Sequence, residues 1–222
     1  VFTRNAFSAA PVKIAREHLA DADTRYFLIN TGNANAGTGA EGEKMALRCC
    51  QWLAEAAGVR ATQVLPFSTG VIGEALPADK IHAAIPELYA ALSPDNWMPA
   101  ATGIMTTDTY PKFRTRLLKL AGQDFRISGI AKGAGMIKPN MATMLAFVFS
   151  DIRVEVATLE RQLEDVVSQS FNRITVDGDT STNDACMLVA SGKGIVFEEL
   201  QAADQELYLA AVRELFQELA MD

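Results

Sequence analysis

Long apolar runs are absent from this sequence of 222 residues, as are the residue clusters that several kinds of site require. No segment approaches the roughly 20 consecutive apolar residues that a membrane-spanning helix needs, so no membrane association is expected. The two histidines, His18 and His82, stand far apart and outside any His or Cys cluster, so no metal site is expected. The three cysteines are an odd number that fits no disulfide framework, which favours the reducing cytoplasm.

Basic residues are also too few for a nucleic-acid-binding protein. The chain has 20 Lys and Arg against 27 Asp and Glu, a net charge of -7, and phosphate neutralisation needs clustered positive charge. Apolar residues make up 49% of the sequence, which at this length is enough to fill a core. The first residue is Val1 and not Met, so we expect a processed chain or a fragment of a longer protein.

The apolar patterns predict alternating helices and strands. Strands are expected at residues 25–30, 63–67, 100–107, 125–131, 143–150 and 185–190. Helices are expected at residues 43–57, 79–92 and 157–171, and Leu207, Ala211, Leu215 and Leu219 mark a last amphipathic helix. This alternation places the chain in the α/β class.

Two loops resemble binding motifs only in part. Residues 37–42 (GTGAEG) match a dinucleotide-binding pattern, but Gly37 stands well beyond the strand end at Asn30, where the pattern needs its first glycine. A Gly-rich loop leading into a helix is expected instead. Residues 177–184 (DGDTSTND) begin like a calcium loop, but Thr182 replaces the glycine that the sharp turn needs, so calcium is not expected.

The segment from Lys132 to Thr143 (KGAGMIKPNMAT) combines features that bend a chain directly before an apolar strand. Gly133 and Gly135 allow a tight turn or a close approach, and Pro139 interrupts regular structure. A lysine and a threonine thus flank a tight, bent segment that leads directly into an apolar strand. Spacing alone favours an ordinary loop with a solvent-facing lysine.

Small residues and hydroxyls follow two other expected strands. Ser68, Thr69 and Gly70 could form an oxyanion hole from a hydroxyl and a backbone N–H, although a plain turn fits the same composition. Thr106 and Thr107 end the strand expected at residues 100–107, where β-propensity alone also favours threonine. No Ser/His/Asp triad can be assembled, because both histidines fall in helical patterns.

Six stretches in this order resemble the ornithine acetyltransferase / glutamate N-acetyltransferase family of arginine biosynthesis. They are residues 30–36 (NTGNANA), 68–73 (STGVIG), 105–109 (MTTDT), 132–137 (KGAGMI), 139–145 (PNMATML) and 177–183 (DGDTSTN). The resemblance extends over residues 1–222. It implies an α/β fold of mixed, layered sheets and helices, of the ornithine acetyltransferase and N-terminal-nucleophile aminopeptidase type.

The resemblance also implies a self-cleaving enzyme. Cleavage between Ala142 and Thr143 would divide the chain into an N-terminal part, residues 1–142, and the start of a C-terminal part, residues 143–222. Thr143 would then be the nucleophile, and its new α-amino group, with a reference pKa near 8, would act as the general base. Thr69 and Gly70 match the oxyanion-stabilising pair.

Lys132 matches a substrate-binding lysine, and one of Thr106 and Thr107 is expected to contact the substrate together with Thr143. The implied reaction moves an acetyl group from N-acetylornithine to glutamate, and some members also accept acetyl-CoA; no separate cofactor is expected. The implied assembly is a heterotetramer of two alpha and two beta chains. Members are longer than this chain and carry an acidic substrate contact beyond Asp222, so a fragment is expected to bind N-acetylornithine poorly. The alternatives are an aminopeptidase of similar architecture and an inactive, truncated interaction domain.

Overall fold

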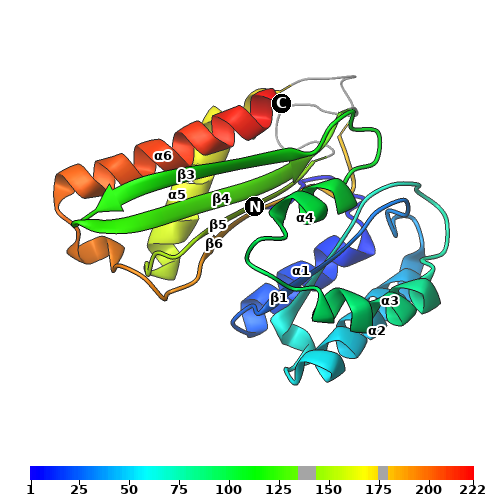
Figure 1. Cartoon of the computed structure of the whole chain (residues 1–222). Helices are drawn as coiled ribbons and strands as arrows, with labels where there is room; N and C mark the ends of the chain where they lie inside the picture. The colour runs from blue at the N-terminus through cyan, green and yellow to red at the C-terminus, as the bar shows by residue number, and fades with distance from the viewer. Residues whose placement is uncertain (135–143, 175–179) are drawn as a thin grey trace.

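The computed structural model describes residues 1–134, 144–174 and 180–222, which form an α/β fold with two sheets (Figure 1). The larger sheet has the order β3-β4-β5-β6, with antiparallel β3–β4 and β4–β5 pairs and a parallel β5–β6 pair. Its strands are Lys112–Leu120, Gln123–Lys132, Leu145–Ser150 and Ala185–Ala190. The smaller sheet pairs β1 (Tyr26–Asn30) with β2 (Val64–Ser68) in parallel. The expected α/β class is confirmed.

The four-stranded sheet separates two apolar cores, which explains why β5 is apolar at almost every position. Ala146 and Val148 of β5 face the core beneath α5 (Val156–Gln169) and α6 (Ala202–Met221). Leu145 and Phe147 face the opposite core, which contains residues of β2 and of α4 (Trp97–Gly103). A strand buried on both faces cannot alternate apolar and polar residues. Figure 1 shows α5 and α6 on one face of this sheet.

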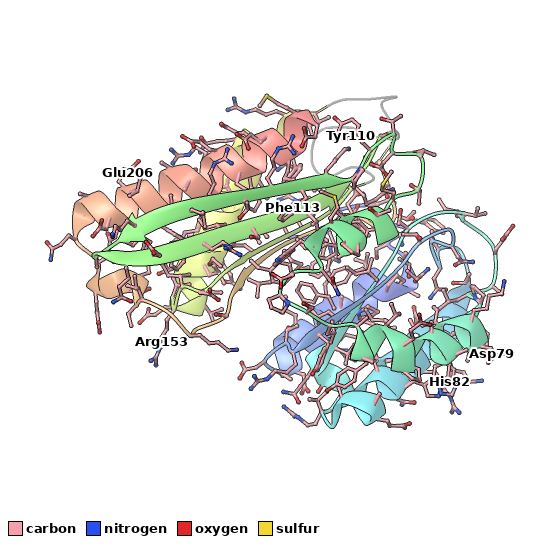
Figure 2. All side chains as sticks on the ribbon, viewed as in Figure 1. Asp79, His82, Tyr110, Phe113, Arg153 and Glu206 are labelled. Carbon is pink, nitrogen blue, oxygen red and sulfur yellow. The ribbon has the colours of Figure 1, made fainter. Side chains whose placement is uncertain are left out.

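Three helices surround the smaller sheet. They are α1 (Ala10–Asp21), α2 (Gly39–Ala57) and α3 (Ala78–Ala90), and a separate cluster of buried residues joins α2, α3 and β2. His18 lies buried in α1 with Nδ1 2.8 Å from the Val64 carbonyl oxygen. His82 stacks on Trp52 at the side of the molecule away from the larger sheet (Figure 2). His18 is therefore a buried packing residue and His82 a surface residue, and both lie in helices, as their patterns indicated.

Two elements differ from the sequence prediction in kind. Residues 97–103 form α4 where a strand was expected, because Trp97, Ala101 and Ile104 recur at helical spacing and bury one face. The β-propensity of threonine and isoleucine misled the interpretation of this segment. Strand β3 was missed, because Arg114, Arg116 and Lys119 interrupt its apolar pattern and its exposed positions include Leu117.

Other differences concern boundaries and faces. Helix α2 begins at Gly39, so residues 39–42 of the expected Gly-rich loop form its first turn. The helix expected at residues 79–92 spans Ala78–Ala90, and Leu88 and Leu92 are exposed. Leu207 of α6 is also exposed, and Tyr208 takes the buried position.

No helix in the described part of the chain is long and apolar enough to cross a membrane. The three cysteines are buried and free. Ala142 and Thr143, the residues of the expected cleavage site, lie outside the described residues, as do residues 175–179 of the Asp-rich loop.

Candidate active site

The predicted site lies where the ends of four strands meet. Strand β2 ends directly before Thr69, and β4 ends at Lys132. Strand β5 is antiparallel to β4, so its first residue, Leu145, pairs with Lys132. Strand β6 is parallel to β5, so Ala185 pairs with Leu145 in turn. The register thus brings together residues that are distant in the sequence.

Lys132 is the centre of this group. Its ammonium Nζ lies 2.6 Å from Thr106 Oγ1 and 3.2 Å from Thr69 Oγ1, and the residue is only 3% exposed. The interpretation of Lys132 as a solvent-facing loop residue is therefore wrong: it is the last residue of a buried strand. Burial lowers the pKa of its ammonium, and the nearby Lys112 adds to this, while the carboxylates of Asp108 and Asp184 act in the opposite direction.

The structure distinguishes the two candidate threonines. Both are exposed residues of the same turn, but the Thr106 hydroxyl accepts a hydrogen bond from Lys132, whereas the Thr107 side chain makes none with the described residues. This turn follows α4 and does not end a strand, which corrects the sequence prediction.

Asp108 holds this turn against the end of β4, a role that the sequence did not indicate. Its carboxylate accepts hydrogen bonds from the Gly133 N–H at 2.7 Å and the Thr106 N–H at 3.2 Å, and Lys112 Nζ lies 3.3 Å from Oδ1. Burial alone would raise the pKa of this carboxyl. The two amide donors and the charges of Lys132 and Lys112 outweigh burial and lower the pKa below its ordinary value. The ionised form therefore fixes the positions of Thr106 and Gly133.

Thr69 and Gly70 sit on a loop that packs backbone against backbone. The Thr69 N–H donates to the Asn30 carbonyl at 3.1 Å. Gly70 has a φ of +134°, and a Cβ at this position would lie 2.3 Å from the carbonyl carbon of Gly32. Only glycine fits both the backbone conformation and the contact. The backbone of Thr69 and Gly70, the pair predicted to stabilise an oxyanion, is thus fixed by its contacts with Asn30 and Gly32.

Asn183, just before β6, ties this loop to the larger sheet. Its Nδ2 donates to the Ala34 carbonyl at 2.6 Å and to the Ser68 carbonyl at 2.9 Å. One buried side chain therefore connects the residue before Thr69 with the chain that enters β6.

Asp184, the next residue, is fully buried. Its Oδ1 accepts the backbone N–H of Met144 at 2.9 Å, and its Oδ2 has no hydrogen-bond partner among the described residues. Burial raises the pKa of this carboxyl to about 7, against the smaller opposing effects of the Met144 N–H, the nearby Ser181 hydroxyl and the Lys132 charge. The sequence places Asp184 in a polar loop and does not indicate that its side chain is buried beside Met144.

A cavity of about 310 Å³ opens beside Lys132. Its walls combine Asp108 and Lys132 of the site with apolar residues from just before β5, from the segment after α5 and from the end of α6. They include Asp108, Tyr110, Lys132, Met144, Phe171, Ile174 and Leu219. A cavity with apolar walls and a buried ammonium suits a small carboxylate-bearing molecule.

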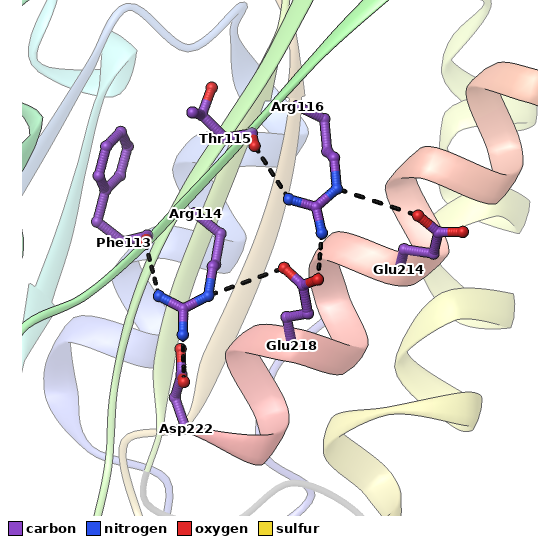
Figure 3. Close-up of polar contacts among 7 residues, drawn as sticks. All are labelled: Phe113, Arg114, Thr115, Arg116, Glu214, Glu218 and Asp222. Atoms are coloured by element: carbon purple, nitrogen blue, oxygen red, sulfur yellow. Dashed lines mark hydrogen bonds and ion pairs between the residues drawn. The ribbon is translucent and has the colours of Figure 1, made fainter.

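Ion pairs between β3 and α6 fix one wall of this cavity (Figure 3). Arg116 pairs with Glu218, and Arg114 pairs with Asp222 at the end of the helix. The Tyr110 hydroxyl, at the same end of α6 (Figure 2), donates to the Asp222 carbonyl oxygen at 2.5 Å. The last turn of α6 is thereby held to the strand that leads back to Asp108.

The whole chain, residues 1–222, matches the model of the ArgJ family. It is 56% identical to the arginine biosynthesis bifunctional protein ArgJ of Methylococcus capsulatus, over 99% of this chain and 54% of that protein. Identity to the protein of the same name from Pseudomonas fluorescens is 51%, over 100% of this chain and 54% of that protein. The chain thus spans about half the length of the curated relatives that it matches.

Solved structures resemble the chain as well. ArgJ of Bacillus halodurans is 35% identical with a TM-score of 0.57, over 64% of this chain and 74% of that chain. Ornithine acetyltransferase of Mycobacterium tuberculosis, solved with ornithine, is 30% identical with a TM-score of 0.53, over 62% and 74% of the two chains. An aminopeptidase of Ochrobactrum anthropi, a variant of the Ntn hydrolase fold, is 12% identical with a TM-score of 0.50, which shows similarity of fold alone.

Proposed function

Because the chain belongs to the ArgJ family, we propose that it carries the acyl-transfer site of an acetyltransferase of arginine biosynthesis. The proposed reaction moves an acetyl group from N-acetylornithine to glutamate through an acetyl ester on Thr143. The observation that supports it most strongly is the position of the Lys132 ammonium between the hydroxyls of Thr106 and Thr69.

This arrangement prepares Thr69 to donate a hydrogen bond. An ammonium has three N–H donors and no acceptor, so the hydroxyl oxygens of Thr69 and Thr106 both accept from Lys132. Each hydroxyl then keeps its own proton for another acceptor. We propose that the Thr69 hydroxyl and the Gly70 N–H donate to the oxyanion of the tetrahedral intermediate, where a nearby buried positive charge adds further stabilisation.

The proposed chemistry has two half-reactions. After cleavage between Ala142 and Thr143, the free α-amino group takes the proton of the Thr143 hydroxyl as its oxygen attacks the acetyl carbonyl of N-acetylornithine. The amide C–N bond breaks, the proton passes to the leaving amine, and ornithine departs from an acetyl-threonine ester. The amino group of glutamate then attacks the ester, and the Thr143 oxygen recovers a proton as N-acetylglutamate forms.

The cavity beside Lys132 is the proposed substrate site. Ornithine and glutamate share an α-carboxylate and a short methylene chain but differ in the charge of the distal group. Lys132 offers a positive charge for the shared carboxylate or for the acetyl carbonyl, and Phe171, Ile174 and Leu219 offer apolar walls for the methylenes. A positive charge for the carboxylate and apolar walls for the methylenes suit both N-acetylornithine and glutamate, which would bind in the same pocket one after the other.

Three further features are part of the proposal. Acetyl-CoA is a second candidate donor, because the same ester can form from any activated acetyl group. The cleaved segments are proposed to stay together as a heterotetramer of two alpha and two beta chains. A cytoplasmic location is proposed, and the three free, buried cysteines are compatible with a reducing compartment.

The test is acetyl transfer from N-acetylornithine to labelled glutamate by the natural polypeptide that carries this chain. Lys132→Met, which keeps the length of the side chain but removes its charge, should lower kcat/KM by roughly 10²-fold or more. Lys119→Met changes an exposed lysine at the other end of the β3–β4 hairpin and should leave transfer unchanged. Absence of transfer in the unmodified protein, or full activity of Lys132→Met, would contradict the proposal.

A further inference from the structure

Three neighbouring strand ends place Lys132, Met144 and Asp184 in a row. Lys132 pairs with Leu145 across β4 and β5, and Leu145 pairs with Ala185 across β5 and β6. The Met144 carbonyl accepts the Ala185 N–H at 3.1 Å, and the Met144 N–H donates to Asp184 Oδ1 at 2.9 Å. The Asp184 side chain thus replaces a backbone carbonyl and extends the β5–β6 pairing by one residue.

The other oxygen of the same carboxyl, Oδ2, takes no part in this backbone pairing. Asp184 is fully buried, and no described residue meets the geometry of a hydrogen bond to Oδ2, although the Ser181 hydroxyl is close enough to this carboxyl to lower its pKa. A buried polar atom without a partner is unfavourable, so a purely structural acceptor would be better served by an uncharged side chain. The positive charge of Lys132 also acts on this carboxyl and lowers its pKa.

We propose that Asp184 is a positioning residue of the acyl-transfer site: its Oδ1 holds the backbone of Met144, and its negative charge stabilises the charged form of Lys132. This inference rests on the proposed function, in which Met144 directly follows the nucleophile in the sequence. The backbone of Met144 is the attachment point of that residue, so its position limits where an attacking hydroxyl can lie.

Ionised Asp184 performs both tasks better than the protonated form. A carboxylate makes a charge-assisted hydrogen bond to the Met144 N–H that is roughly twice as strong as a neutral one. It also attracts the Lys132 ammonium, on which the charges of Asp108 and Lys112 act as well. Activity that depends on Asp184 should therefore rise as the pH increases through the range in which Asp184 ionises, near pH 7.

Stability should show the opposite trend with pH. The pKa of Asp184 is higher in the folded protein than its ordinary value of 3.8, so the folded state binds more protons between about pH 4 and pH 7. The contribution of this carboxyl to stability is therefore fully present at low pH and is lost as the pH rises through 7. If Asp184 had only a structural role, its ionisation would change activity and stability in the same direction as the pH rises.

The experiment compares Asp184→Asn and Asp184→Ala with the unmodified natural polypeptide. Asparagine keeps an oxygen for the Met144 N–H and removes the charge, whereas alanine removes both. Asp184→Ala should lower kcat by roughly 10²-fold, the typical effect of a displacement of about 1 Å at a reacting group. Asp184→Asn should recover most of this loss at pH 5.5. The kcat of the unmodified protein divided by that of Asp184→Asn should increase roughly tenfold between pH 5.5 and pH 8.5. Only aspartate ionises over this range and gains the stronger, charge-assisted hydrogen bond.

Asp151→Asn is the matched control, because Asp151 is exposed and directly follows the opposite end of β5. It should leave kcat and its pH profile unchanged. In the unmodified protein, the ¹³C shift of the Asp184 carboxyl should titrate near pH 7, a measurement that does not depend on how the variants fold.

A pH-independent kcat ratio, or a carboxyl that titrates near its ordinary value of 3.8, would overturn this inference. The proposed function is tested separately by Thr143→Ala. If Thr143→Ala abolishes transfer while Asp184→Asn behaves like the unmodified protein, the inference fails and the proposed function stands. If Thr143→Ala transfers normally, the proposed function itself fails.

Discussion

The Lys132 ammonium lies 3.2 Å from the Thr69 hydroxyl oxygen, although 63 positions separate the two residues in the sequence. Thr69 follows a strand of the smaller sheet, and Lys132 ends a strand of the larger one. The contact therefore joins the two sheets at the point where the proposed chemistry takes place. Because the ammonium occupies a lone pair of the hydroxyl, the Thr69 proton remains available for an acceptor in the site.

Thr69→Val should lower kcat by roughly 10²–10³-fold, since it removes one oxyanion donor and keeps the shape of the side chain. Thr69→Ser restores the hydroxyl and should recover most of the activity. Thr62→Val is the control, because the Thr62 hydroxyl is buried without a hydrogen-bond partner in the described part of the chain. Steady-state transfer kinetics measure all three variants. An active Thr69→Val would show that this hydroxyl is not an oxyanion donor.

Thr106 and Thr107 should differ sharply in spite of their adjacency. Both residues are exposed, but the Thr106 hydroxyl accepts from Lys132 at 2.6 Å, whereas the Thr107 side chain has no hydrogen bond to a described residue. We expect Thr106→Val to reduce kcat/KM by about tenfold, a typical effect of losing one hydrogen bond to a charged group. Thr107→Val should stay close to the unmodified protein. Equal losses in both variants would contradict this assignment.

Gly70→Ala should destabilise the fold more than Gly73→Ala. Both glycines have positive φ, so alanine costs about 1–3 kcal/mol of backbone strain at either position. At Gly70 the new Cβ would also lie 2.3 Å from the Gly32 carbonyl carbon, whereas at Gly73 no atom lies within 4 Å. Denaturant unfolding of the two variants measures the difference. Equal losses would mean that the loops do not approach each other this closely.

Asp108→Asn should destabilise the protein at neutral pH and progressively less in acid. The pKa of Asp108 is lower in the folded protein than its ordinary value of 3.8, so the carboxylate contributes stability above about pH 4 that is lost as the pH falls through the folded pKa. The difference in unfolding free energy between the two proteins should therefore shrink below pH 4. A difference that stays constant between pH 3 and pH 7 would contradict the proposed role of the charge.

Strands β4, β5 and β6 of the larger sheet could be predicted from the sequence, because most of their residues are apolar and buried. Residues 185–190 form a strand with the predicted bounds, since an apolar run there lies between polar loops. The strand predicted at residues 100–107 was wrong, because the helix there is short, so its apolar spacing is hard to recognise, and its composition favours strands. Strand β3 carries too many charges to be recognised without its neighbours.

The candidate site was predictable only through its motifs. The order of the motifs indicated Lys132, Thr69 and Gly70, but the spacing around Lys132 alone favoured a solvent-facing loop. Asp108 and Asp184 could not be found in this way, because they bind the backbone amides of Gly133 and Met144. These contacts arise from pairing between distant strands, and no local pattern records them.

The central claim is that Thr143 carries the acetyl group, and mass spectrometry of the natural polypeptide tests it most directly. The protein is incubated with N-acetylornithine, quenched in acid and analysed as intact segments. We expect a segment that begins Thr-Met-Leu-Ala-Phe, residues 143–147, and that gains the mass of one acetyl group, which glutamate then removes. An uncut chain that still transfers acetyl groups, or transfer without any acetylated segment, would contradict the account.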